Sequence, residues 1–284
     1  MKLSIPSPLQ SVTRLAGIFT VLLMLQGCGL TLANWITPDD GYDEISILSY
    51  GESERQSIEV FHPVKTPIKP QLLIFFYGGA WEEGSKEDYH FVAQAFTKQG
   101  YRVAIPDYRL YPEVKFPDFI EDGAAAVATL AQQFPDSPIV LMGHSAGAHI
   151  AAMLTLNETY LNQQDFDRQR IAAFVGWSGP YDFLPLTSKT LEKIFVEEQR
   201  PASQPINFVT ANAPPTLLIH GLDDDRVKPK NSKNLAEKLR QHGVVVTTHY
   251  YEGASHAATV GSLIRFFSSW SNTLPDTLEF LDTL

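Results

Sequence analysis

The chain has 284 residues, 44% hydrophobic and 19% charged, with a formal net charge of −10 at pH 7. This composition is typical of a globular protein and excludes a disordered chain or one that spans a membrane throughout. The acidic balance excludes nucleic acid as a partner, because phosphates are neutralised by clustered lysine and arginine. At this length one α/β domain is expected, and the single cysteine leaves it without disulfides.

The N-terminal segment has the pattern of an export signal. An apolar run from Leu15 to Leu25 follows two basic residues and is shorter than a typical transmembrane helix. The run ends in LQGC, which resembles the lipobox of bacterial lipoproteins. The resemblance implies a signal peptide over residues 1–27, acylation of Cys28 and attachment to the outer membrane of a bacterial envelope. The alternatives are a plain secretory signal, which gives a periplasmic or secreted protein, and an uncleaved anchor.

The rest of the chain alternates between strand-like and helix-like segments. Residues 28–44 are rich in turn formers and acids and are predicted to form a tether, so the folded domain is expected over residues 45–284. The predicted strands are Ile45–Leu48, Ser57–Phe61, Leu72–Tyr77, Arg102–Ile105, Pro138–Met142, Ala172–Trp177, Thr216–His220 and Val244–Tyr250, with the first two as an antiparallel pair. The predicted helices are Glu87–Gln99, Phe119–Phe134, Ala146–Leu154, Ser232–His242 and Ala257–Trp270. This alternation predicts an α/β fold whose mostly parallel central sheet has helices on both faces.

Ser145 lies between two glycines, in GHSAG, at a predicted junction of strand and helix. A chain that turns from strand to helix within two residues crowds its own backbone, and Gly143 and Gly147 lack the Cβ atoms that would clash. This context favours a nucleophile elbow, in which a sharp turn presents a serine hydroxyl. Taken alone, the motif is also compatible with a tight turn that has no chemical role.

Two loops that follow later strands supply candidate partners for Ser145. A serine nucleophile needs a base to take its proton and an acid to orient the base. The sequences HGLDDDRV and EGASH follow GHSAG in the chain, and together the three motifs resemble those of the α/β-hydrolase family. The resemblance implies a triad of Ser145, Asp224 as the acid and His256 as the base. A metal site in the aspartate run is the alternative, although no second cluster of ligands accompanies it.

The motif YGGAW follows the predicted strand Leu72–Tyr77. It resembles the HGGGW or HGGxW loop of the carboxylesterase, BD-FAE feruloyl-esterase-like and kynurenine-formamidase-like branch of the family, with tyrosine in place of histidine. The segment PDYRLYPEVKFPDFIED resembles DYRLAPEHPFPAALED of the same branch. The resemblance implies an oxyanion hole formed by the N–H groups of Gly79, Ala80 and Ala146, with Gly78 as a substitute donor. We expect the Tyr77 hydroxyl to hold this loop, as the histidine does in the relatives.

The α/β-hydrolase resemblance implies a serine hydrolase that cleaves small-molecule carboxylic esters through an acyl-enzyme and needs no cofactor or metal. A small lid is predicted at about residues 183–213, and Trp81, Trp177 and Phe183 are predicted to line the substrate pocket. His144 and His149, which flank the elbow, are expected to have structural roles within the turn and the helix.

Three other functions stay open at this point. An arylformamidase-like amidase acting on N-formylkynurenine would use the same chemistry with a different leaving group. A peptidase is disfavoured because the chain has no propeller or large gating domain. An inactive envelope protein that only binds a ligand would be expected to have lost part of the triad. The sequence does not predict an oligomeric state.

Overall fold

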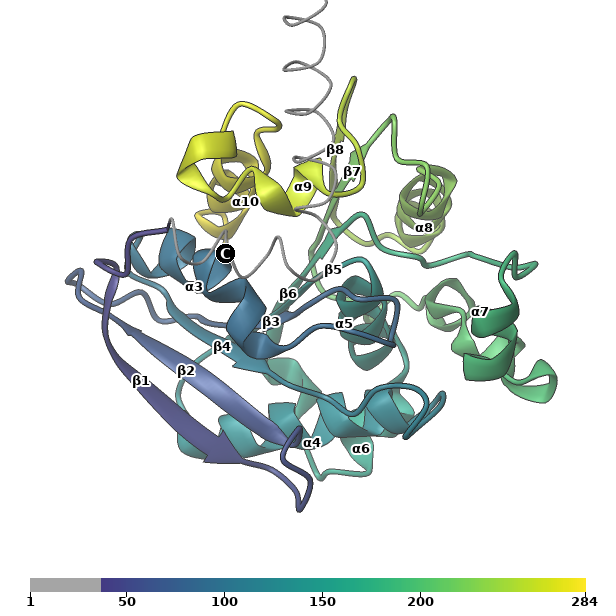
Figure 1. Cartoon of the computed structure of the whole chain (residues 1–284), viewed down its shortest axis with the longest axis horizontal. Coiled ribbons are helices and arrows are strands. Elements are labelled where there is room, and N and C mark those ends of the chain that lie inside the picture. The colour runs from purple at the N-terminus through teal and green to yellow at the C-terminus, as the bar shows by residue number, and fades with distance from the viewer. Residues whose placement is uncertain (1–36) are drawn as a thin grey trace, which may run out of the picture.

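An eight-stranded sheet runs through residues 37–284, the part of the chain that the computed structural model describes (Figure 1). Its strand order is β1-β2-β4-β3-β5-β6-β7-β8. The pair β1–β2 is antiparallel and most of the other pairs are parallel, as the sequence predicts, while β2–β4 is a second antiparallel pair. The strands are β1 Tyr42–Ser49, β2 Ser57–Pro63, β3 Leu72–Phe76, β4 Arg102–Pro106, β5 Ile139–His144, β6 Ile171–Trp177, β7 Thr216–Gly221 and β8 Val246–Tyr251.

Helices cover both faces of this sheet. Figure 1 shows α3, α9 and α10 on one face and α4, α5 and α6 on the other, while α8 packs against β7 and β8. The α-helices are α3 His90–Thr97, α4 Asp118–Gln133, α5 Ala146–Leu156, α6 Glu158–Asn162, α7 Lys189–Ile194, α8 Lys230–Gln241, α9 Ala258–Gly261 and α10 Thr273–Leu281. Short 3₁₀ segments are η1 Lys86–Tyr89, η2 Arg168–Arg170, η3 Glu197–Gln199, η4 Pro201–Ser203, η5 Pro205–Phe208 and η6 Arg265–Phe267.

The central parallel strands form the core of the molecule. Every residue of β3 and β5 is buried, as expected for strands that have helices on both sides. The edge strand β1 is largely exposed. It begins at Tyr42, so the last three residues of the predicted tether belong to the sheet.

The predicted C-terminal helix Ala257–Trp270 is wrong. Helix α9 ends at Gly261 and Ile264 is extended. The sequence analysis did not predict α10. The hydroxyl of Ser271 donates to the carbonyl of Ala258, at 3.2 Å, and contacts the hydroxyls of Ser262 and Thr273, both at 2.8 Å. Such side-chain bonds compete with helical backbone bonds, so the serine-rich stretch folds back instead of continuing the helix.

The predicted signal peptide, residues 1–27, and the predicted acylation site Cys28 lie outside the described residues. Within residues 37–284, no helix combines the length and the apolar character needed to cross a membrane.

The turn between β5 and α5 packs directly against the end of β3. A Cβ atom on Gly147 would lie 2.0 Å from the carbonyl oxygen of Phe76 and 2.4 Å from that of Tyr77. A Cβ atom on Gly143 would lie 2.4 Å from the backbone of Gly147. Backbone therefore touches backbone here, which confirms the steric reason for both glycines.

Gly147→Ala is expected to lower the free energy of unfolding by about 3 kcal/mol, because the overpacked backbone must move. This loss outweighs the roughly 1 kcal/mol that alanine gains over glycine inside a helix. The measurement is urea denaturation followed by circular dichroism.

Gly123→Ala, in α4, is the matched control. Its added Cβ would meet side-chain atoms of Ile150, Leu154 and Phe76, at 3.0, 3.1 and 3.3 Å, and no backbone atom is among its three nearest neighbours. We expect this variant to stay within about 1 kcal/mol of the parent. Equal unfolding midpoints for the two variants would contradict the steric explanation.

Candidate active site

Ser145 occupies the residue between β5 and α5 in an unusual backbone conformation. Its φ is 54° and its ψ is −122°. The N–H of Ser145 donates to the carbonyl of Trp177 at 3.0 Å, and its own carbonyl accepts from the N–H of His149 at 3.1 Å. These bonds hold a conformation that L-residues rarely adopt, so the hydroxyl is presented at the carboxyl end of the sheet.

The structure brings the three predicted triad residues together. The Nε2 atom of His256 lies 2.9 Å from Oγ of Ser145. The Nδ1 atom of the same ring lies 2.7 Å from Oδ2 of Asp224. Asp224 and His256 are 2% and 9% exposed. This hydrogen-bonded chain lets the imidazole take the serine proton while the carboxylate fixes its orientation.

The carboxylate of Asp224 is charged although it is buried. Burial alone would raise its pKa, but hydrogen bonds from His220 and His256 hold the pKa below its usual value. The second oxygen accepts from the backbone N–H groups of Arg226, at 3.0 Å, and Val227, at 2.8 Å. The loop after β7 therefore wraps around its own carboxylate.

The two histidines beside the elbow have structural roles, but their partners lie outside the turn and the helix. Nε2 of His144 is 3.1 Å from the carbonyl oxygen of His256, and Nε2 of His149 is 2.8 Å from that of Ser203. Burial lowers the pKa of His144 to about 3 and that of His149 to about 4. Both rings are therefore neutral at pH 7, and each donates its Nε2 proton to a distant loop.

The loop after β3 lies beside the nucleophile. A Cβ atom on Gly78 would be 3.1 Å from Cβ of Ser145. The carbonyl of Gly79 accepts from the N–H groups of two later loop residues, and Ala80 has a φ of 53°. The N–H groups of Gly79 and Ala80 have no acceptor within residues 37–284. Together with the N–H of Ala146 at the start of α5, they are the donors that an oxyanion hole requires.

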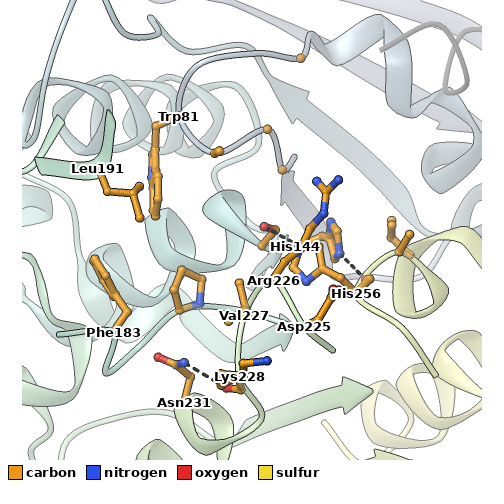
Figure 2. A pocket seen from close by; sticks show the side chains of 18 of the residues that line it. Trp81, His144, Phe183, Leu191, Asp225, Arg226, Val227, Lys228, Asn231 and His256 are labelled. Atoms are coloured by element: carbon orange, nitrogen blue, oxygen red, sulfur yellow. Dashed lines mark hydrogen bonds between the residues drawn. The ribbon is translucent and has the colours of Figure 1, made fainter. Parts of the chain in front are cut away.

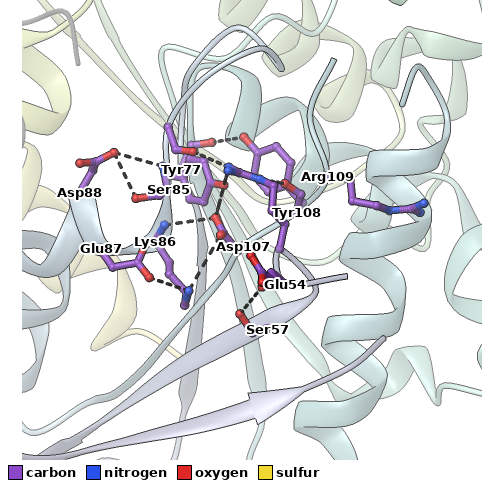
Figure 3. A network of polar contacts seen from close by, with 12 residues as sticks. Glu54, Ser57, Tyr77, Ser85, Lys86, Glu87, Asp88, Asp107, Tyr108 and Arg109 are labelled. Atoms are coloured by element: carbon purple, nitrogen blue, oxygen red, sulfur yellow. Dashed lines mark hydrogen bonds and ion pairs between the residues drawn. The ribbon is translucent and has the colours of Figure 1, made fainter. Parts of the chain in front are cut away.

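Tyr77 supports this loop through a buried polar network (Figure 3). Its hydroxyl donates to the carboxylate of Asp107 and accepts from the guanidinium of Arg55, at 3.1 Å for the latter. Arg55 also donates to the carbonyl of Gly84, and Asp107 accepts from the N–H of Lys86 at 3.2 Å. Arg55 and Asp107 thus link the far end of the loop, at Gly84 and Lys86, to the hydroxyl of Tyr77 at its start. Burial raises the pKa of Tyr77, so this hydroxyl keeps its proton.

Two further tyrosines complete the support. The ring of Tyr77 stacks between those of Tyr89 and Tyr108, at centroid distances of 5.4 and 4.6 Å. The hydroxyl of Tyr108 donates to the carbonyl of Tyr77, and that of Tyr89 donates to the carbonyl of Gly78. The sequence comparison of YGGAW with HGGxW did not predict Arg55, because that residue lies in the distant turn between β1 and β2.

A cavity of about 730 Å³ opens beside Ser145 and His256 (Figure 2). The predicted pocket residues Trp81 and Phe183 line it, together with the loop residues Gly78, Gly79 and Ala80. The prediction that Trp177 lines the pocket is wrong. Its side chain is fully buried, with its ring 5.6 Å from that of Phe75 and stacked at 6.2 Å on that of Phe96, which places it in the core under α3.

The segment between β6 and β7, where a small lid is predicted, contains α7 and three 3₁₀ turns, η3 to η5. Two buried amides fasten it. The side-chain oxygen of Asn231 accepts from the N–H groups of Tyr181 and Asp182, at 3.0 and 2.8 Å, and that of Gln204 accepts from the N–H of Phe183 at 2.8 Å. No sequence pattern pointed to either amide, because each acts across segments far apart in the chain.

Residues 58–239 match the family model described as BD-FAE. The chain belongs to the BD-FAE family. The match covers the strands around the nucleophile and the acid loop, but ends before His256, which the hydrogen-bond geometry supplies.

Several curated relatives of this BD-FAE chain are enzymes by name. A probable isoprenylcysteine alpha-carbonyl methylesterase of Arabidopsis thaliana is 29% identical over 236 residues, 73% of this chain and 49% of that protein. Esterase LipC of Mycobacterium tuberculosis is 30% identical, over 67% of this chain and 54% of LipC. A kynurenine formamidase of Salmo salar is 34% identical, over 49% of this chain and 47% of that protein. The chain therefore spans about half the length of these relatives.

Solved structures establish the fold of the BD-FAE chain. A truncated carbohydrate esterase from gut microbiota superposes with a TM-score of 0.76 at 21% identity, covering 87% of this chain and 98% of the other. Esterase 2 of Thermogutta terrifontis gives a TM-score of 0.69 at 22% identity, covering 87% and 96%. The chain has the α/β-hydrolase fold, as its sequence predicts.

Proposed function

We propose that the chain is a serine hydrolase that cleaves carboxylic esters through an acyl-enzyme on Ser145. The observation that carries the proposal is the hydrogen-bonded chain from Ser145 through His256 to Asp224. It lies beside a loop that offers the N–H groups of Gly79 and Ala80. A nucleophile, its base and its oxyanion donors are the parts that acyl transfer needs.

The reaction begins when Oγ of Ser145 attacks the ester carbonyl carbon and Nε2 of His256 accepts the serine proton. The carbonyl electron pair moves to oxygen, and the N–H groups of Gly79, Ala80 and Ala146 stabilise the resulting oxyanion. Collapse of this intermediate breaks the C–O bond, and His256 donates the proton to the leaving alcohol. Water, deprotonated by the same imidazole, then attacks the acyl-enzyme and releases the acid.

A second candidate activity is hydrolysis of a formamide. The formamidase of Salmo salar is 34% identical to this chain over 140 residues, a higher identity over a shorter stretch than the 29% and 30% of the two named esterases. The same triad would serve both reactions, because only the leaving group differs. The names of the other relatives, a methylesterase and LipC, favour the ester.

The test is hydrolysis of p-nitrophenyl acetate, butyrate and octanoate, with N-formylkynurenine as the amide arm. The parent chain is expected to hydrolyse the esters, and Ser145→Ala to lose about 10⁶-fold in kcat, as the loss of a triad nucleophile does. Circular dichroism of both proteins checks that the fold is kept. Equal rates for parent and variant, or no hydrolysis and no fluorophosphonate labelling of the folded parent, would favour the ligand-binding protein instead.

The support of the oxyanion loop gives a second prediction. Tyr77→Phe removes the hydroxyl that joins Asp107 and Arg55, so the loop donors shift away from the oxyanion. We expect kcat to fall about tenfold or more, a fraction of what a whole oxyanion donor is worth, with KM little changed. Tyr250→Phe is the control, because no hydrogen bond of the Tyr250 hydroxyl exists within the described residues. A similar fall in kcat for both variants would contradict the prediction that the Tyr77 hydroxyl positions the oxyanion loop.

We also propose that the chain is exported and held in the bacterial envelope by acylation of Cys28. The support is the apolar run of residues 15–25 followed by LQGC. Metabolic labelling with a palmitate analogue is expected to mark the full-length protein in a bacterial host and to leave Cys28→Ala unmarked. Labelling of both proteins, or of neither, would contradict the anchor.

A further inference from the structure

The cavity beside the triad has two chemically different sides. In Figure 2, Trp81, Phe183 and Leu191 gather on one side, while Arg226 and His256 lie on the other. The aromatic side is built from rings in mutual contact, since Trp81 and Phe183 lie 6.1 Å apart between centroids. An apolar group of a substrate fits against these rings, and a charged group does not.

Three cationic side chains, which come from the acid loop and the start of α8, also belong to the lining of the cavity. Arg226, Lys228 and Lys230 all line the cavity. Within the described range, no ion pair or hydrogen bond is made by the charged group of any of the three, although the backbone of Arg226 and of Lys228 is hydrogen-bonded. This is unusual in a chain with a net charge of −10, where acidic partners are abundant.

Arg226 is held in place by the catalytic machinery itself. Its backbone N–H donates to Oδ1 of Asp224 at 3.0 Å, and the next N–H, that of Val227, donates to the same oxygen at 2.8 Å. The loop geometry that orients His256 therefore also fixes the base of the Arg226 side chain. Arg226 is exposed and lines the cavity, and a guanidinium can form two parallel hydrogen bonds with one carboxylate.

Acidic side chains also line the cavity, and they limit what can bind there. Glu83 belongs to the loop after β3, Asp88 belongs to η1, and Asp225 is the neighbour of Arg226. Asp88 already accepts from the N–H and hydroxyl of Ser85. None of these acids forms an ion pair with Arg226, so within the described chain the guanidinium has no ion-pair partner.

We propose that the ester cleaved at this site carries an anionic group, such as a carboxylate, that binds Arg226 while an apolar group packs against Trp81 and Phe183. The proposal rests on the proposed esterase function and names its substrate class. Lys228, on the same loop, and Lys230, at the start of α8, add to the positive potential of the cavity. This potential attracts an anionic ester before it binds.

Matched ester pairs test the proposal with the full-length chain. In one pair, 4-carboxyphenyl butyrate and 4-carbamoylphenyl butyrate differ only in the charge of the leaving group. In the other, the mono-p-nitrophenyl ester of adipic acid and p-nitrophenyl hexanoate differ in the charge of the acyl end. We expect kcat/KM to be about tenfold higher for the anionic ester of at least one pair, as one hydrogen bond to a charged group gives, and this preference to shrink at high salt.

Variants at Arg226 show whether this side chain is the cause. Arg226→Gln is expected to abolish the preference, by raising KM for the anionic ester about tenfold relative to the neutral one, and Arg226→Lys to restore part of it. Arg265→Gln makes the same change of charge on exposed η6 outside the cavity and is expected to keep the parent's preference.

Two results would overturn the inference. If the neutral ester is preferred in both pairs, or if Arg226→Gln and Arg265→Gln behave alike, the guanidinium does not select the substrate, and the esterase function stands without it. If the folded parent hydrolyses none of the four esters, the proposed function itself fails and the substrate class fails with it.

Discussion

The contact between the glycine turn and the end of β3 is the constraint on which the site depends. Because Gly147 lies against the carbonyls of Phe76 and Tyr77, α5 starts immediately beside the strand that leads into the YGGAW loop. One backbone contact thus places the nucleophile next to the donors that stabilise the oxyanion. The strained conformation of Ser145 is tolerated because β5 is packed between β3 and β6, which fix the backbone that leads into the turn.

A single buried carboxylate, that of Asp224, organises the loop after β7. Asp224 receives hydrogen bonds from two histidine rings and two backbone N–H groups, which compensate for the loss of water around its charge. The same bonds shape the loop that projects Arg226 into the cavity. His220 reinforces this shape, since its Nε2 atom is also 2.8 Å from the carbonyl of Val227. The same loop therefore determines both the orientation of His256 and the position of Arg226 in the cavity.

The sequence was most informative where one local pattern decides the outcome. The sheet and the triad could be predicted because apolar runs, turn residues and the chain order of GHSAG, HGLDDDRV and EGASH are local features. Trp177 was misplaced because its position at the end of a strand does not tell which neighbouring helix covers its ring. Helix α10 was missed because Pro275, tolerated in a first helical turn, interrupts the helical pattern. Arg55, Asn231 and Gln204 act between distant segments, so no pattern along the chain reveals them.

The hairpin of β1 and β2 lies at the edge of the sheet, but through Arg55 it supports the loop after β3. This arginine sits in the turn between β1 and β2, yet its guanidinium reaches both Tyr77 and the carbonyl of Gly84. The region shared with the BD-FAE family begins only at residue 58, beyond that turn. A domain boundary drawn at the family match would therefore separate the Ser145 site from one of its own supports. Transfer of this domain to another protein requires the hairpin as well.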